Sequence, residues 1–262
     1  MLIAHLFRHP ASSGLFFQGG TALRWCYGGS RFSEDLDFES CLAADEVCAL
    51  LAKAGSAIRR DLVAHLGPGR LELQTEGMAG PLGKAWVRFA PANFRGKIAV
   101  KLEFQRIVGP LRPDTQPMIM GTLPAVAQRL QGGSLKTDPH AILLAETLPE
   151  IMAGKLRALL ERPAYKGRDF WDIWFLEQTC GVKADPETVA RKIRMYDFTQ
   201  RRSVADVLRD LGAHGDLTRA QILDDLKRFV PAAVADALES THLPTMLASV
   251  HRVLASLPDA LF

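Results

Sequence analysis

The chain has 262 residues, of which 48% are hydrophobic and 23% charged, the balance of an ordinary globular protein. Its formal net charge of +3 permits a nucleic-acid partner without arguing for one. Four cysteines without CxxC spacing are interpreted as reduced thiols, and no histidine pairs with cysteine or glutamate at zinc-ligand spacing. No signal peptide and no stretch of about 18 apolar residues is evident, so we expect a cytoplasmic protein without membrane contact.

The first half of the chain is predicted to contain short strands separated by glycine and proline. A strand over 15–18 leads into Gly19-Gly20, and a short helix over 21–27 and a strand over 31–38 follow. Apolar residues at helical spacing predict a longer helix over 43–66. Three further strands are expected over 71–75, 85–89 and 97–105, the last with Ile98, Val100, Leu102 and Phe104 alternating with polar side chains. This order indicates an α/β (α+β) fold, a mixed sheet with flanking helices.

The second half of the chain is predicted to be helical. From about Leu143 strand signals give way to helical periodicity, with breaks near Pro163, Gly181, Gly215 and Pro231. The segment 108–139, rich in proline and glycine, is expected to be a connector with a short helix over 123–130. The chain therefore divides into an α/β core over 1–140 and a helical C-terminal region over 141–262.

The densest chemistry lies in Gly19-Gly20-Thr21 and in Arg31-Phe-Ser-Glu-Asp-Leu-Asp-Phe38. Glycines let a backbone turn approach a ligand closely, and the amides of a helix N-terminus favour phosphate. On a strand, Asp35 and Asp37 would point to the same face, and two such carboxylates suit Mg²⁺ or Mn²⁺. An isolated Asp-x-Asp is more often a solvated strand end, but the upstream Gly-Gly-Thr favours a metal and phosphate site.

These two motifs closely resemble the first motif of the AbiEii family of nucleotidyltransferase toxins, which includes the MenT toxins. The family belongs to the DNA polymerase β-like nucleotidyltransferase superfamily, so the resemblance implies a nucleotidyltransferase-like fold. It also implies a two-metal transfer of NMP from an NTP, with Asp35 and Asp37 as metal ligands. The nucleotide would be bound by Gly19, Gly20, Thr21, Arg31, Ser33, Lys155 and Asp172.

The second motif of the family, Lys-x-Asp on a strand, is matched here by Lys101-Leu102-Glu103, with glutamate in place of aspartate. Glu103 is on the polar face of its predicted strand together with Lys101. It is a candidate third catalytic carboxylate and metal ligand. The alternative is a role as an ion-pair partner.

A third region joins two predicted helices. Lys155 shares a mostly apolar stripe and needs an anionic partner if it is buried. Asp169 and Asp172, three residues apart, share one face of a strongly apolar helix, and Lys155 and Arg168 are their candidate partners. The resemblance implies that Lys155 contacts the triphosphate and that Asp169 is catalytic. The alternative is a structural ion-pair network between the helices.

Basic residues also gather near two aromatic side chains towards the C-terminal end. The group consists of Arg191, Lys192, Arg194, Arg201 and Arg202, with Tyr196 and Phe198. This pattern could bind RNA phosphates and stack a base. A solvated helical face is the commoner explanation, and it is favoured here.

The resemblance further implies the toxin of a toxin–antitoxin or phage-defence pair, with a cognate antitoxin as partner. Some relatives add nucleotides to the 3′ end of tRNA, which makes tRNA the favoured acceptor. Two alternatives stay open. One is transfer to a small molecule, as in antibiotic nucleotidyltransferases, and the other is a nucleotide-binding interaction protein without catalysis.

Overall fold

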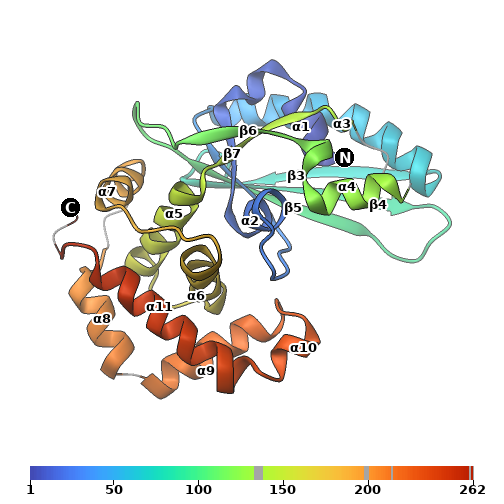
Figure 1. Cartoon of the computed structure of the whole chain (residues 1–262). Coiled ribbons are helices and arrows are strands. Elements are labelled where there is room, and N and C mark those ends of the chain that lie inside the picture. The colour runs from blue at the N-terminus through green and yellow to red at the C-terminus, as the bar shows by residue number, and fades with distance from the viewer. Residues whose placement is uncertain (133–137, 198–200, 214, 260, 262) are drawn as a thin grey trace. The chain divides into compact units, whose positions relative to one another are not determined.

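The computed structural model describes residues 1–132, 138–197, 201–213, 215–259 and 261 (Figure 1). These residues form two compact units, neither of which is a continuous stretch of chain. The first comprises Met1–Gly28, Glu34–Val108 and Thr115–Glu146, and the second comprises Gly29–Ser33, Gly109–Asp114 and Thr147–Phe262. The short segments 29–33 and 109–114 thus belong to the second unit although the first unit flanks them in sequence.

The first unit is built on a mixed sheet, as the sequence predicts. Its strands in the described residues are β1 (Leu15–Gln18), β2 (Leu36–Ser40), β3 (Gly69–Glu76), β4 (Leu82–Pro91), β5 (Ile98–Arg106), β6 (Thr115–Ile119) and β7 (Ile142–Glu146). Their order across the sheet is β3-β4-β5-β2-β1-β7-β6. The β2–β5 and β1–β7 pairs are parallel, and the other neighbours are antiparallel.

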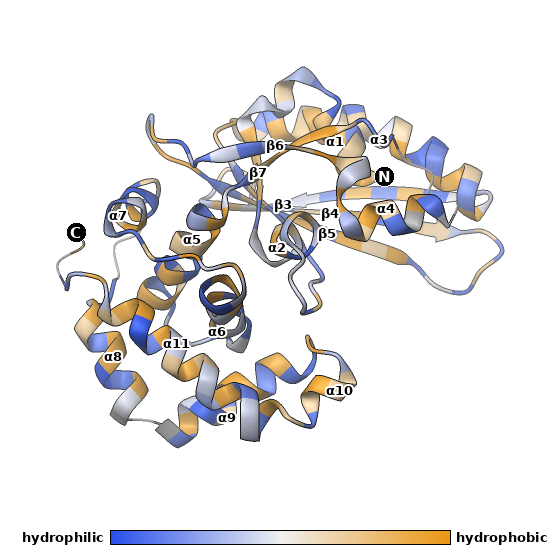
Figure 2. Ribbon diagram, viewed as in Figure 1, coloured by the Kyte–Doolittle hydropathy of each residue, from blue (hydrophilic) through white to orange (hydrophobic). Residues whose placement is uncertain are grey.

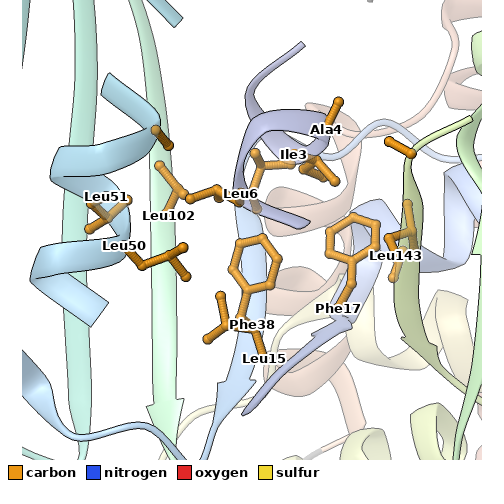
Figure 3. Packing of buried hydrophobic residues seen from close by; sticks show 14 of the residues in the cluster. Ile3, Ala4, Leu6, Leu15, Phe17, Phe38, Leu50, Leu51, Leu102 and Leu143 are labelled. Atoms are coloured by element: carbon orange, nitrogen blue, oxygen red, sulfur yellow. The ribbon is translucent and has the colours of Figure 1, made fainter. Parts of the chain in front are cut away.

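Four helices flank this sheet within the described residues, namely α1 (Leu2–Phe7), α2 (Gly19–Tyr27), α3 (Ala44–Leu66) and α4 (Pro124–Gln131). Helix α3 packs on β3 and β4, whereas α2 packs on β1, β2 and β7. The core gathers around the central strands (Figure 3), where Phe38 of β2 is fully buried. Its ring stacks on Phe104 of β5 with centroids 5.4 Å apart and lies 5.5 Å from the Phe17 ring of β1. These contacts hold the three strands to one another.

The sequence-based expectations are wrong at three places in this unit. The strand expected over 31–38 begins only at Leu36, so Asp35 precedes it and Asp37 lies on it. The connector expected over 108–139 contains the strand β6, which includes Pro117 and lies at the sheet edge, where proline is tolerated. The helical region was expected from about Leu143, but strand β7 continues to Glu146 and lies inside the sheet. Its short apolar run cannot be distinguished from a helix by periodicity.

The second unit is helical. Its helices are α5 (Leu148–Glu161), α6 (Gly167–Trp174), α7 (Pro186–Arg194), α8 (Val204–Ala213), α9 (Gly215–Lys227), α10 (Ala232–Ala235) and α11 (Leu243–Ala255). Helix α6 is central, since it packs against α5, α9 and α11. Helices α8 and α9 carry both hydrophobic and hydrophilic residues (Figure 2). No helix in the described part of the chain is long and apolar enough to cross a membrane.

Helix α6 approaches α9 so closely that its first residue has to be glycine. A methyl group added at Gly167 would overlap the backbone carbonyl oxygen of Ile222. At Gly154, within α5, an added methyl group would lie 3.6 Å from the side chain of Lys192, an ordinary contact. The two glycines therefore differ in the space around them although both are helical.

We expect Gly167→Ala to destabilise the protein by about 1–3 kcal/mol, because overpacking forces the two helices apart. Gly154→Ala is the matched control, and it should be neutral or stabilise by up to about 1 kcal/mol through helix propensity. Urea unfolding followed by circular dichroism measures both values. Equal effects of the two substitutions would contradict the close approach of α6 and α9.

Candidate active site

In the first unit, the turn from β1 into α2 brings a glycine against the carboxylate of Asp37. Gln18 is the cross-strand partner of Asp37, and Gly19 follows it with a φ of +76°. A Cβ atom at Gly19 would lie 2.5 Å from Oδ2 of Asp37. Glycine is therefore required here twice, for the left-handed backbone and for the close approach. The start of α2 is thereby placed beside this carboxylate.

Thr21 connects the same turn to Asp35. Its hydroxyl, in the first turn of α2, donates a hydrogen bond to the backbone carbonyl of Asp35, and the residue is buried. Gly20 beside it is also buried. Because Asp35 lies outside the strand, this hydrogen bond fixes its backbone where the β-ladder does not. The Gly-Gly-Thr segment therefore lies against both Asp35 and Asp37.

Lys101 joins two carboxylates of the predicted site. Its ammonium nitrogen lies 2.7 Å from Oδ2 of Asp35 and 3.0 Å from Oε1 of Glu103. Glu103 is in turn the register partner of Asp37 on the neighbouring parallel strand. Burial alone would lower the pKa of Lys101, but its hydrogen bonds to Asp35 and Glu103 raise it. The ammonium group therefore stays charged and holds the two carboxylates together.

The donor chemistry of these carboxylates fits a hard divalent cation. Within the described residues, no three carboxylate, imidazole or thiol groups lie close enough together to enclose an ion by themselves. Mg²⁺, however, is commonly held by one or two carboxylates and completes its coordination with water and phosphate oxygens. Asp35 and Asp37 are the candidate ligands for such an ion, and Glu103 shares the ammonium group of Lys101 with Asp35.

The second unit contains its own cluster of predicted residues. Arg31 binds Asp172 of α6 in a bidentate arrangement, with N–O distances of 2.6 and 2.7 Å. Both residues are buried, so solvent does not screen their charges. The bidentate geometry matches the two charged groups well. The adjacent backbone is also held, because the amide of Phe32 donates to the carbonyl oxygen of Phe229 at 2.6 Å. Ser33, half-buried, ends this short segment.

Lys155 of α5 extends the cluster. Its ammonium nitrogen lies 2.9 Å from Oδ1 of Asp169 and 2.7 Å from Oδ2 of Asp172. Arg162 forms a further ion pair with Asp169. Burial alone would raise the pKa of Asp169, but Lys155 and Arg162 lower it to about 2. The cluster thus combines three cations with two carboxylates and keeps a surplus of one positive charge.

Most members of this cluster are predicted from the sequence, but one predicted partner is wrong. Arg168, expected beside Asp169 and Asp172, instead lies 3.4 Å from Asp225 and stacks on Phe229. The cation that it was thought to supply comes from Arg162. Arg162 directly follows the last residue of α5 and lies seven residues before Asp169, and this short separation was the available signal for their ion pair. Helical spacing cannot describe such a position, because the chain is not helical there.

The basic group around α7 is paired with carboxylates within the unit, so the solvated helical face favoured from the sequence is wrong at Lys192, which is fully buried. Arg191 and Lys192 form ion pairs with the buried Glu150, and Arg201 and Arg202 pair with Glu161 and Asp210. The ring of Tyr196 is covered by the guanidinium group of Arg157, 3.6 Å from its centroid. Arg194 is exposed, and Phe198 lies outside the described residues.

The charge of Asp169 should make stability depend on pH. With a pKa of about 2 in the folded protein and about 4 when unfolded, the carboxylate stabilises the fold above about pH 4. This contribution is lost as the pH falls through about 2. Asp169→Asn should therefore cost about 2 kcal/mol at neutral pH and less in acid.

Thermal unfolding of wild type and Asp169→Asn between pH 3 and pH 6 measures this effect. The difference in Tm should stay nearly constant down to about pH 4 and shrink from there towards pH 3. Asp236→Asn, an exposed aspartate of the same unit, is the control and should show a small difference throughout. A gap for Asp169→Asn that stays constant across this range would exclude the ionised carboxylate as its source.

Two solved structures resemble this chain. JHP933 from Helicobacter pylori has 21% sequence identity and a TM-score of 0.53, over 97% of this chain and 89% of that one. A predicted nucleotidyltransferase from H. pylori also has 21% identity, with a TM-score of 0.52 over 97% of this chain and 92% of that one. At this identity the likeness shows a common fold. No curated protein gives a significant match.

Membership of a family is shown by the sequence as a whole. Residues 2–246 match the family model described as "Nucleotidyl transferase AbiEii toxin, Type IV TA system". The match covers nearly the entire chain. It includes both groups of residues described above, from Gly19 to Asp172. The chain belongs to the AbiEii family of nucleotidyltransferase toxins of type IV toxin–antitoxin systems.

Proposed function

We propose that this nucleotidyltransferase transfers NMP from an NTP to an RNA acceptor, with the 3′ end of tRNA as the favoured substrate. The observation that carries the proposal is the close approach of Gly19 to the carboxylate of Asp37. This contact supports the proposal, because backbone amides at the start of a helix can bind phosphate and an adjacent carboxylate suits a metal ion. In the cell, the protein would act as the toxin partner of a cognate antitoxin, in a toxin–antitoxin or phage-defence system.

In this proposal Asp35 and Asp37 hold Mg²⁺ or Mn²⁺, and Glu103 lies beside them. Such an ion, when bound, neutralises charge on the triphosphate and on the departing pyrophosphate. The backbone of Gly19, Gly20 and Thr21 binds phosphate oxygens at the start of α2. Lys101 keeps Asp35 and Glu103 in place through its two hydrogen bonds.

A proton must leave the acceptor hydroxyl when it attacks the α-phosphorus, and we assign its removal to Glu103. The other candidate, Asp169, is buried against Lys155 and Arg162, and its pKa of about 2 makes it a weak base at neutral pH. Asp169 and Asp172 instead orient Lys155 and Arg31. The surplus positive charge of their cluster suits a polyphosphate.

Asp37→Ala should lower transfer activity at least about a hundredfold, because a bound metal ion contributes several kcal/mol of charge stabilisation. The assay follows label from each α-labelled NTP, with Mg²⁺, into total bacterial tRNA. Glu34→Ala removes an exposed carboxylate three residues away and serves as the matched control with unchanged activity. Full activity of Asp37→Ala would show that the proposed site is wrong.

The same assay separates the rival acceptors. Label in tRNA from wild type supports the RNA acceptor and identifies the nucleotide. If tRNA takes up no label while small aminoglycoside-like acceptors do, the small-molecule alternative is correct. Nucleotide binding without any pyrophosphate release would indicate an interaction protein that does not catalyse transfer.

Gly19→Ala tests the phosphate turn against a closely matched control. Gly19 is the first residue of α2 and Gly28 follows its last residue, and their φ values are +76° and +75°. An added Cβ at Gly28, however, meets no atom within 4 Å. Both alanine variants should lose about 1–2 kcal/mol of stability, the cost of a left-handed residue with a side chain. Only Gly19→Ala should also lose transfer activity, by at least about tenfold, since its methyl group displaces Asp37. Equal activity of the two variants would contradict this role.

A further inference from the structure

The β4–β5 hairpin has a charge distribution unlike that of the rest of the chain. Residues 82–106, from the start of β4 to the end of β5, contain six of the 32 cationic residues and one of the 29 acidic ones, Glu103. The rest of the chain therefore has a net charge of −2, and the basic excess of the protein lies in this hairpin. A polyanion is the partner that such a segment would attract.

Strand alternation turns part of this charge towards one face of the sheet. Ala85, Val87 and Phe89 of β4 are buried on the face that packs against α3. Lys84, Trp86 and Arg88 alternate with them and are only half-buried, so they lie on the opposite face. This face combines cations with a large aromatic ring.

The side chains on this face are already arranged around the indole ring of Trp86. The guanidinium carbon of Arg88 lies 4.9 Å from the ring centroid, and the ammonium nitrogen of Lys101 lies 6.0 Å from it. Arg88 also donates to the side-chain oxygen of Gln74 at 2.6 Å, and Glu72 is its cross-strand partner on β3. Aromatic rings flanked by cations are the surfaces on which single-stranded nucleic acids stack their bases.

The register links this surface directly to the proposed catalytic carboxylates. Lys84 is the cross-strand partner of Glu103, and Glu103 is the partner of Asp37. The three side chains therefore form one row across β4, β5 and β2 on the same face of the sheet. Since neighbouring strands are about 4.8 Å apart, Lys84 lies about 10 Å from Asp37.

The tip of the hairpin continues the same pattern. Phe94 is 72% exposed, which is unusual for an aromatic side chain, and the exposed Arg95 and Lys97 are close to it in sequence. Along β4 the cations and aromatic rings thus follow one another from Lys84, next to the carboxylates, to Phe94 at the tip. A strand of RNA could follow this path with its end at Glu103 and Asp37.

We propose that the β4–β5 hairpin binds the single-stranded 3′ end of the acceptor RNA, with a base stacked on Trp86 and phosphates bound by Lys84 and Arg88. The inference rests on the proposed transfer to RNA, and it adds the surface and the direction of the acceptor. The terminal hydroxyl lies at Glu103, and the preceding nucleotides extend along β4 towards Phe94.

The test measures binding apart from transfer. A fluorescein-labelled 12-nucleotide RNA ending in CCA is titrated with protein, and the Kd is read from fluorescence anisotropy at two salt concentrations. Trp86→Ala should weaken binding about tenfold, whereas Trp86→Phe should stay close to wild type because a ring is retained. Lys84→Glu combined with Arg88→Glu should weaken binding further and reduce its salt dependence.

The matched control makes the same charge change on the opposite face. Lys53 and Arg59 are exposed on α3, so Lys53→Glu combined with Arg59→Glu should leave the Kd nearly unchanged. Thermal unfolding and NTP binding, measured for every variant, establish that the fold and the nucleotide site persist. If the folded Trp86→Ala protein binds RNA as tightly as wild type, or if both double variants weaken it equally, the inference is wrong.

These outcomes separate the hairpin from the proposed function. Wild-type protein that labels tRNA, together with hairpin variants that have unchanged Kd and KM, overturns the inference and leaves the function standing. Loss of RNA binding in the hairpin variants supports the inference even if no NTP labels the RNA. Binding of an acidic protein instead of RNA would assign the hairpin to another class of partner and overturn the proposal.

Discussion

The register of β2 is the constraint on which the first unit depends. This strand lies between β1 and β5, and its alternation sends Phe38 into the core and Asp37 to the other face. A slip of one residue would reverse both directions. The stacking of Phe38 on Phe104 and its contact with Phe17 oppose such a slip. The aromatic core thereby fixes where the carboxylate lies relative to Gly19 and Glu103.

The second unit depends on a different kind of interaction, a buried cluster of opposite charges. Moving Arg31, Asp172 and Lys155 out of water is costly, and the cost is recovered only where every charge has a well-placed partner. The bidentate geometry of Arg31 and the two contacts of Lys155 meet that condition. Such clusters contribute little net stability, but they hold side chains in one arrangement.

Much of this could be predicted from the sequence, because local patterns determine it. The long helix α3, the strand β5 and the shared face of Asp169 and Asp172 follow from periodicity alone. The missed elements lack such a pattern. The apolar run of β7 is too short to have a period, and β6 includes a proline. Asp35 was placed on a strand, although the turn at Thr21 holds it outside the ladder.

Side-chain partners were harder to predict than elements. Lys155 was correctly expected to meet Asp169 and Asp172, since a buried lysine needs an anion and two were available one helix away. Arg168 was expected there too, but it pairs instead with Asp225, which is close in space although 57 residues away in sequence. The place of Trp86 beside Lys101 was not predicted for the same reason, because only the pairing of β4 with β5 brings the two residues together.

The division of the chain into discontinuous units has a consequence for its synthesis. The segment 29–33 belongs to the second unit, and Arg31 finds its partner Asp172 at a sequence separation of 141 residues. A growing chain therefore exposes Arg31 long before the ribosome has made the carboxylate that receives it. The helical unit cannot be completed from its own contiguous residues, so folding of the final structure has to wait until most of the chain has been translated. Products that terminate before Asp172 would leave Arg31 without this partner.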